Sequence, residues 1–540
     1  MISRLRELPI RFQALLLLMV LFSVYGVFDH FFDGILPIHE WRKTDSLSIA
    51  LNYAKGASFL EPQTQWISAN DTRNAAAEFP IIYFVLGKLW LLFGQHEWIA
   101  KTLSISILFI AISFFSEVME FLFQQKRKAL LFVFILASSP VLLFYADSIL
   151  PNIYGFAFVL LGAYGTFKFI QSKQVFWLGF LTLFFALAVL VKITVLICLL
   201  SFGGAYFLWT LFQGIQTFKA NAYFWFSFLV SFLLICVICY GWYSFAIHYN
   251  EKFGSELFST TVRPIWEVDA ETRKAIWTQF WKYMLPGLYH PSVFLISILF
   301  FLFAAWKKWI PSYVLCLLFT GSLGLIAYFM LWFWVFDVHD YYLLEMFFFP
   351  LILFYILLQY GDRLIRSSKS KQIVTFIFSG LVFLQAISLA HWSFGKNNLI
   401  TKNTPFVSDF VKGNWGYFHF YHENHLKQLQ DFSQEIQELI PQKDTIICLS
   451  DPSPNIQLYT LNRIGFSHYS FHPPQQETEQ LAKMIEKGAN FAVVIREQTE
   501  EPRKDWEMFL SHPIFERRNI HVYDLRPFRR KNNGNSKLNQ

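Results

Sequence analysis

The sequence predicts an all-α polytopic membrane protein of about eleven transmembrane helices with outer-face interfacial helices, followed by a small C-terminal α/β extracytoplasmic domain. Of its 540 residues 55% are hydrophobic and only 15% are charged, whereas soluble domains have about 25% charged residues. Long apolar runs fill the chain as far as residue 391, and polar residues become frequent after it. We therefore divide the chain into a transmembrane domain, 1–394, and an extracytoplasmic α/β domain, 395–540.

The first predicted span is the apolar run from Phe12 to Val27, which follows Arg4, Arg6 and Arg11. No small-residue cleavage site follows this run, so we interpret it as an uncleaved span with a cytoplasmic N-terminus. The later spans are expected at 98–123, 129–146, 153–170, 176–191, 193–212, 222–242, 290–306, 311–336, 342–361 and 372–391.

The basic residues between the spans support this topology. If the spans alternate, all of these residues face the same side as the N-terminus: Lys126, Arg127, Lys128, Lys173, Lys219, Lys307, Lys308, Arg363, Arg366, Lys369 and Lys371. That is the positive-inside pattern. An odd number of spans then places residues 395–540 outside the cytoplasm. A further span at Phe79–Gly94 would invert the pattern, so this aromatic run is interpreted as an interfacial or re-entrant helix.

The tail has the alternating pattern of an α/β module. Helices are expected at 421–439 and 475–487, strands at 444–450, 490–497 and 519–525, and a disordered end at 532–540. The net charge of +7 is weak support for a nucleic-acid partner, and none is predicted. The Cys236–Cys239 pair has apolar flanks, so we interpret both residues as small hydrophobes rather than a redox or zinc site.

Charged residues at membrane edges are costly to retain, so their clustering is informative. Five clusters are expected on the outer face: 39–45, 77–80, 145–148, Lys192 and 337–342. Each has a structural alternative. Asp45 or Asp147 could cap a helix or turn, and Glu78 could complement a helix dipole. Lys192 could extend to the interface as lysines near span ends do, and His339 could belong to an aromatic belt.

With these motifs the sequence resembles the C-type (GT-C) polytopic membrane glycosyltransferases. Within them it is similar to the group of family 39 protein mannosyltransferases, lipid A aminoarabinose transferases and lipopolysaccharide sugar transferases. The motifs that carry the resemblance are Trp41-Arg42-Lys43-Thr44-Asp45, Glu78-Phe79-Pro80, Lys192 between paired spans, and His339 to Leu344 with Pro350. The chain departs from the group in having Ser46 after Asp45, Phe79 after Glu78, and a tail that matches no known pattern.

The resemblance implies an enzyme that transfers a hexosyl or pentosyl group from a polyprenyl phosphate, with inversion, to an extracytoplasmic acceptor. The acceptor class is a lipopolysaccharide or other lipid, a glycan or a protein, and the expected location is a bacterial inner membrane. Asp45 is the candidate catalytic base, with Glu78 second. The candidates for binding the phosphate and sugar are Arg42, Lys192, His339, Tyr342 and Asp147.

A divalent metal is a further possibility that the resemblance raises, with Glu78 and His248 as ligands. Two scattered ligands are a weak signal compared with a dense motif. No Gly-rich phosphate loop is present, which argues against direct use of a sugar nucleotide.

Two other functions remain open. A flippase or transporter of lipid-linked sugars would show paired, interrupted spans in two related halves, which we do not find. A polymerase or ligase of lipid-linked glycans would carry Arg and His in a large outer loop, and the 243–289 segment has Arg263, Arg273 and His248.

Overall fold

The computed structural model describes residues 7–258, 262–365, 367–395, 406–470, 477–496, 506 and 508–529. The chain forms two compact units. One comprises Met1–Phe32, Ala100–Tyr243 and Thr261–Trp415, and the other comprises Asp33–Ile99, Ser244–Thr260 and Gly416–Gln540. Most of the tail thus shares a compact unit with two segments from between the predicted spans, and the domain boundary expected at residue 394 stays a prediction. The predicted disordered end, 532–540, lies outside the described residues.

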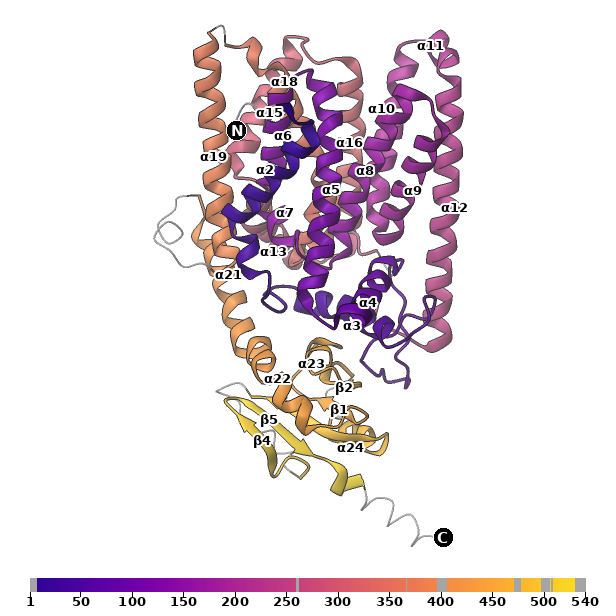
Figure 1. Ribbon diagram of the computed structural model, residues 1–540, viewed down its shortest axis with the longest axis vertical. Helices are drawn as coiled ribbons and strands as arrows, with labels where there is room; N and C mark the ends of the chain where they lie inside the picture. The colour runs from indigo at the N-terminus through magenta and orange to yellow at the C-terminus, as the bar shows by residue number, and fades with distance from the viewer. Residues whose placement is uncertain are drawn as a thin grey trace. The chain divides into compact units, whose positions relative to one another are not determined.

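Apolar helices that run alongside one another make up the first unit (Figure 1). The α-helices that lie wholly or mainly in it are α2 (Ile10–Tyr25), α5 (Glu97–Phe123), α6 (Lys126–Ala137), α7 (Pro140–Tyr145), α8 (Pro151–Ser172), α9 (Val175–Val191), α10 (Leu196–Phe212), α11 (Ile215–Ala220), α12 (Ala222–Phe253), α13 (Ala270–Gln279), α14 (Leu285–Leu288), α15 (Pro291–Trp306), α16 (Ser312–Leu331), α17 (Leu343–Met346), α18 (Phe348–Tyr360) and α19 (Ser368–Ser393). Short 3-10 or π-helical turns join several of them, namely η1 (Val27–His30), η2 (Ile193–Val195), η3 (Ile265–Glu267), η4 (Phe280–Met284), η5 (Phe333–Asp337), η6 (Asp340–Tyr342) and η7 (Gly361–Arg363).

The described residues contain six helices that are long and apolar enough to cross a membrane, or up to eight if two bent pairs are each one span. The chain is an integral membrane protein, and the count of eleven spans stays a prediction. Two of the expected spans are interrupted. The 129–146 run breaks between Ala137 and Pro140, where the proline lacks the N–H that a continuous helix needs. The 342–361 run bends by 51° between Met346 and Phe348.

In the second unit, α3 (Glu40–Ala54) packs closely on α4 (Ile81–Phe93). Gly87 permits this approach, since a Cβ there would lie 2.6 Å from the Cβ of Tyr53 and 2.7 Å from the carbonyl oxygen of Ala50. The helix expected at Phe79–Gly94 is therefore present as α4, and its close packing fixes the segment around Glu78 relative to α3.

The remainder of the second unit contains a five-stranded sheet and the helices that accompany it (Figure 1). Its strands are β1 (Thr445–Cys448), β2 (Gly465–Ser467), β3 (Ala489–Ile495), β4 (Pro513–Arg517) and β5 (Ile520–Asp524), and its order is β2-β1-β3-β5-β4. β1 pairs in parallel with β2 and β3, whereas β5 is antiparallel to β3 and β4. The accompanying helices are α21 (Asp409–His422), η8 (Glu423–Lys427), α22 (Gln428–Leu439), α23 (Ile456–Thr460), η9 (His468–Ser470) and α24 (Glu477–Glu486). The small C-terminal α/β module is thus present as predicted.

Alternate residues of β1 face two separate apolar cores, as the period of a strand requires. Ile446 packs in one core with residues of α22, and Ile447 packs in the other with residues of α24. Trp66 belongs to the first of these cores although it precedes the sheet by almost four hundred residues. Its neighbour Ile67 donates its backbone N–H to the carbonyl oxygen of Gly465 at 2.7 Å. The segment around Trp66 is therefore an integral part of the sheet's fold.

Candidate active site

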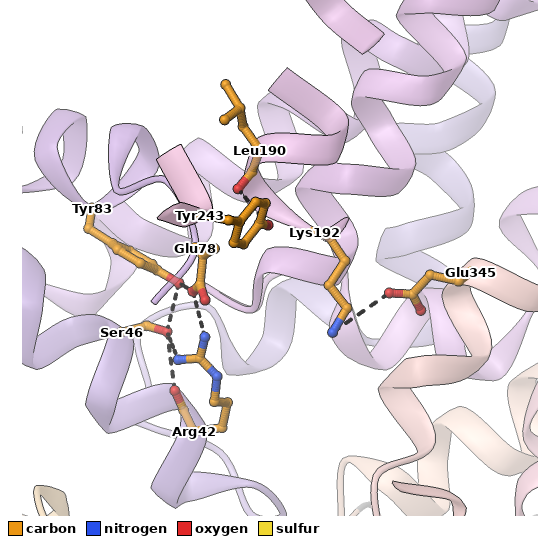
Figure 2. Close-up of polar contacts among 8 residues, drawn as sticks. All are labelled: Arg42, Ser46, Glu78, Tyr83, Leu190, Lys192, Tyr243 and Glu345. Atoms are coloured by element: carbon orange, nitrogen blue, oxygen red, sulfur yellow. Dashed lines mark hydrogen bonds and ion pairs between the residues drawn. The ribbon is translucent and has the colours of Figure 1, made fainter. Parts of the chain in front are cut away.

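Arg42, on the first turn of α3, lies at the centre of a polar cluster (Figure 2). Its Nη2 is 2.5 Å from Oε1 of Glu78, and its Nη1 donates to the hydroxyl of Ser46 at 3.0 Å. The hydroxyl of Tyr83, from the first turn of α4, also donates to Glu78. Because Arg42 and Ser46 are four residues apart they share one face of α3, and that face meets the start of α4.

These contacts determine the charge of Glu78. Burial by itself would raise the pKa of this carboxyl, but the Arg42 guanidinium and the Tyr83 hydroxyl outweigh burial and hold the pKa below its ordinary value. Glu78 is thus an ionised carboxylate, and its Oε1 already accepts hydrogen bonds from Arg42 and Tyr83.

Asp45 also lies on α3, one turn after Trp41, and is 3% exposed. Its Oδ1 accepts a hydrogen bond of 2.8 Å from Nδ2 of Asn455, in the loop that precedes α23. Burial is the main cause that raises the pKa of Asp45 to about 7; Asn455 and Arg42 oppose this rise, and the negative charges of Asp451 and Glu78 contribute to it. The two sequence-predicted carboxyls therefore differ: Glu78 is held ionised, whereas Asp45 changes its protonation state near neutral pH.

Such a divergence between neighbouring carboxyls is the pattern expected where one group accepts a proton and the other stays charged. A general base works best when its pKa lies near the operating pH. Asp45 meets this condition and Glu78 does not.

Lys192 lies in the first unit, where α9 ends and the backbone turns extended before η2. Its ammonium is 3.7 Å from the ring centroid of Tyr342. The same ammonium is 3.9 Å from Oε1 of Glu345 (Figure 2). Glu345 is 8% exposed and also accepts from Asn152 at 2.8 Å and from Thr194 at 3.0 Å. The structure thus places a half-buried cation against an aromatic face and a carboxylate.

The remaining predicted residues of the first unit have other surroundings. The ring of His339 is 6.2 Å from that of Tyr342, so the structure brings His339, Tyr342 and Lys192 into one neighbourhood. Asp147 instead pairs with Lys101, with 3.8 Å between the carboxylate and the ammonium. Asp147 therefore has the buried Lys101 as its partner and is not among the contacts of Lys192.

The residues proposed as metal ligands do not fit a metal centre. Glu78 is engaged by Arg42 and Tyr83, and the exposed His248 bonds through Nδ1 to the carbonyl oxygen of Ser244 at 3.2 Å. Across the described ranges no three His, Cys, Asp or Glu side chains gather as a metal would require. We derive no step through a metal.

Two functional candidates were missed in the sequence. Glu345 follows Tyr342 by three residues, and an acidic side chain within an apolar run is itself a signal of function. Asn455 gives no local signal, because it lies 410 positions from Asp45 and within a polar segment.

The fold is shared with solved structures of other proteins. The chain is similar to the crystal structure of ArnT from Cupriavidus metallidurans bound to undecaprenyl phosphate, with a TM-score of 0.52 and 13% identity over 94% of this chain and 97% of ArnT. The apo form of ArnT gives a TM-score of 0.50 at the same identity and coverage. ArnT is a lipid A aminoarabinose transferase with the C-type fold, so the resemblance predicted from the sequence is confirmed at the level of the fold.

A third similar structure is the archaeal oligosaccharyltransferase AglB from Archaeoglobus fulgidus, in complex with an inhibitory peptide and a dolichol-phosphate. Its TM-score is 0.46, with 11% identity over 89% of this chain and 69% of AglB. No family model and no curated protein matches the sequence.

Proposed function

We propose that the protein is a membrane glycosyltransferase that moves a sugar from a polyprenyl-phosphate donor to a hydroxyl of an extracytoplasmic acceptor. The observation that carries this proposal is the pair of carboxyls Asp45 and Glu78, which lie in the same unit and whose pKa values shift in opposite directions. The shared fold with ArnT supports it, because that structure holds undecaprenyl phosphate.

In the proposed reaction an acceptor hydroxyl oxygen forms the new bond to the anomeric carbon of the sugar. The bond from that carbon to the phosphate oxygen breaks, and its electron pair leaves with the polyprenyl phosphate. Asp45 takes the hydroxyl proton, and attack opposite the leaving group inverts the anomeric configuration. Lys192, with His339 and Tyr342 near it, is the candidate group for the charge of the departing phosphate. Arg42 serves instead to keep Glu78 ionised.

This reaction requires that the segments with Asp45 and Glu78 lie outside the cytoplasm, as the positive-inside pattern predicts. A phosphatase that is active only outside the cytoplasm, fused after Gln540, should therefore be active, and a β-galactosidase at the same place should be silent. The reverse result would overturn the proposed topology.

The function can be tested before the sugar is known, because every donor of this class releases the same product. The full-length protein in nanodiscs would be incubated with a panel of undecaprenyl-phosphoryl hexoses and pentoses and with a bacterial envelope lipid extract. Release of undecaprenyl phosphate would be measured by mass spectrometry.

Asp45→Asn should bind undecaprenyl phosphate as the wild type does but lose about 100- to 10,000-fold in its release, since Asn has the same shape and accepts no proton. Lys483→Ala, which removes an exposed ion pair with Glu479 in the same unit, is the control. Undiminished release by a folded Asp45→Asn protein would refute the proposed mechanism.

A further inference from the structure

Asn455 is fully buried at the start of α23, in the C-terminal part of the second unit. An asparagine at this position normally accepts a hydrogen bond from the first turn of its helix. Here its side chain makes no such bond. The carboxylate of Asp451 accepts from the N–H of Gln457 at 2.7 Å, and the hydroxyl of Ser453 accepts from the N–H of Ile456 at 3.0 Å. Because two other side chains cap the helix, the amide of Asn455 is available for another role.

The orientation of this amide is determined by its neighbours. Its Oδ1 accepts from the backbone N–H of Trp66 at 3.2 Å and from the hydroxyl of Ser48 at 3.1 Å. An oxygen must therefore face Trp66, since a backbone N–H can only donate. The Nδ2 group then points at Asp45, which it reaches at 2.8 Å. The backbone of Trp66 is in turn fixed by the sheet through the pairing of Ile67 with Gly465.

We propose that Asn455 is a positioning residue for Asp45, through which the C-terminal α/β module orients the proton acceptor of the transferase. The proposal rests on the proposed function of Asp45 as the base. The bond from Asn455 occupies Oδ1, and within the described ranges no hydrogen-bond donor is directed at Oδ2. Asn455 thus holds one oxygen of the carboxylate and leaves the other for the acceptor hydroxyl.

The charged and titratable groups around Asp45 show what the loss of Asn455 would do. Arg42 on α3 favours the ionised carboxylate, whereas Glu78 before α4 and Asp451 after β1 disfavour it. Tyr469 in η9 also interacts with Asp45. Among the described residues Asn455 gives the side-chain hydrogen bond that lowers the pKa of Asp45, because a hydrogen bond to the charged form of an acid favours that form. Removal of Asn455 therefore shifts the ionisation of Asp45 to higher pH.

The test uses the full-length protein in nanodiscs and the undecaprenyl-phosphoryl sugar that the donor panel identifies, with release of undecaprenyl phosphate measured from pH 5.5 to 9. Asn455→Ala should shift the acid limb of the kcat/KM profile to higher pH by about one unit. Below pH 7 kcat/KM should then be about tenfold lower than in the wild type, and at high pH it should return to the wild-type value. KM for the donor should not change. Asn455→Asp, which keeps the shape of the side chain, should move the limb at least as far because it adds a second carboxylate.

Asn490→Ala is a matched control, because its Nδ2 donates to Oδ1 of Asp444 at 3.0 Å in the same module and does not contact Asp45. This control should leave the acid limb unchanged. A loss of activity that is equal at every pH in both Asn455 variants would indicate a purely structural role and overturn the inference. An unshifted limb in a folded Asn455 variant would also overturn it. If Asp45→Asn were fully active the proposed function itself would fail, so the two failures are distinguishable.

Discussion

The guanidinium of Arg42 lies 2.5 Å from the carboxylate of Glu78, with both side chains largely buried. This pair changes the roles that the sequence suggested. Arg42 was expected to bind the donor phosphate, yet its charge is compensated by Glu78 and its second nitrogen is bonded to Ser46. A buried charge left without its partner is strongly destabilising. Arg42 and Glu78 are therefore best understood as one neutral unit that supports the local fold beside Asp45.

The first prediction compares the two carboxyls directly. Glu78→Gln should lower the unfolding temperature, because it leaves Arg42 buried without a negative partner, at a cost of about 3–5 kcal/mol. The residual folded protein should retain more turnover than Asp45→Asn. Thermal unfolding and release of undecaprenyl phosphate would be measured for both variants. If Glu78→Gln abolishes turnover and Asp45→Asn keeps more than about a tenth of it, well above the expected general-base loss, then Glu78 is the base.

The second prediction is the pH dependence of transfer. Burial raises the pKa of Asp45 to about 7, so the carboxyl is protonated below that pH and cannot accept the acceptor's proton. We expect kcat/KM to fall about tenfold for each pH unit below 7 and to level off above it. Glu78, whose pKa is lowered, stays ionised throughout this range and contributes no limb. A limb near pH 4 would show that Asp45 is hydrated and not buried during the reaction.

The sequence predicted those parts of the fold that depend on local hydrophobicity. The 98–123 and 153–170 runs match α5 and α8 within two residues at each end, because long apolar runs specify a helix in lipid. The tail strands with alternating or continuous apolar residues, β1, β3 and β5, were also predicted. β2 has only three residues and β4 is largely exposed, so neither has the apolar pattern that identifies a strand.

The sequence indicates the residue types of the candidate site but not the contacts between them. Asp45, Glu78 and Lys192 are recognisable because charges near apolar runs are costly. The contact of Asp45 with Asn455 joins positions 410 residues apart, and no periodicity encodes such a pairing. The pairing of Lys192 with Glu345 likewise depends on how α9 and α17 pack and not on either segment alone.

The third prediction concerns Lys192. Its ammonium lies 3.7 Å from the centroid of the Tyr342 ring and 3.9 Å from Oε1 of Glu345. If it binds the donor phosphate, Lys192→Ala should weaken the binding of undecaprenyl phosphate by about 10- to 150-fold, the loss of one charge-assisted hydrogen bond. Lys168→Ala is the control, since Lys168 pairs with Glu117 in the same unit. If Lys192 only compensates Glu345, adding Glu345→Gln should restore stability and binding together.

The last prediction tests whether the sheet and the segment around Trp66 fold as one unit. Gly465 is the first residue of β2 and makes two backbone hydrogen bonds to the segment around Trp66. Its N–H donates to the carbonyl oxygen of Gln65 at 3.1 Å, and its carbonyl oxygen accepts from the N–H of Ile67 at 2.7 Å. A Cβ at Gly465 would lie 2.0 Å from the carbonyl oxygen of Ile446, which is backbone and cannot rotate away. Gly465→Ala should therefore separate β2 from β1 and destabilise the protein by at least the 1–3 kcal/mol typical of overpacking.

The matched control for Gly465→Ala is Gly416→Ala in α21, where nothing lies within 4 Å of an added Cβ. This change should stabilise the helix by up to about 1 kcal/mol, because alanine is the better helix former. Hydrogen exchange of both variants would be measured by mass spectrometry. In Gly465→Ala faster exchange should appear in peptides that cover 63–68 as well as in β1 and β2, because Trp66 and Ile67 lose their support. Slow exchange of 63–68 in that variant would show that this segment folds without the sheet, and that Asn455 is not needed to hold Asp45 in place.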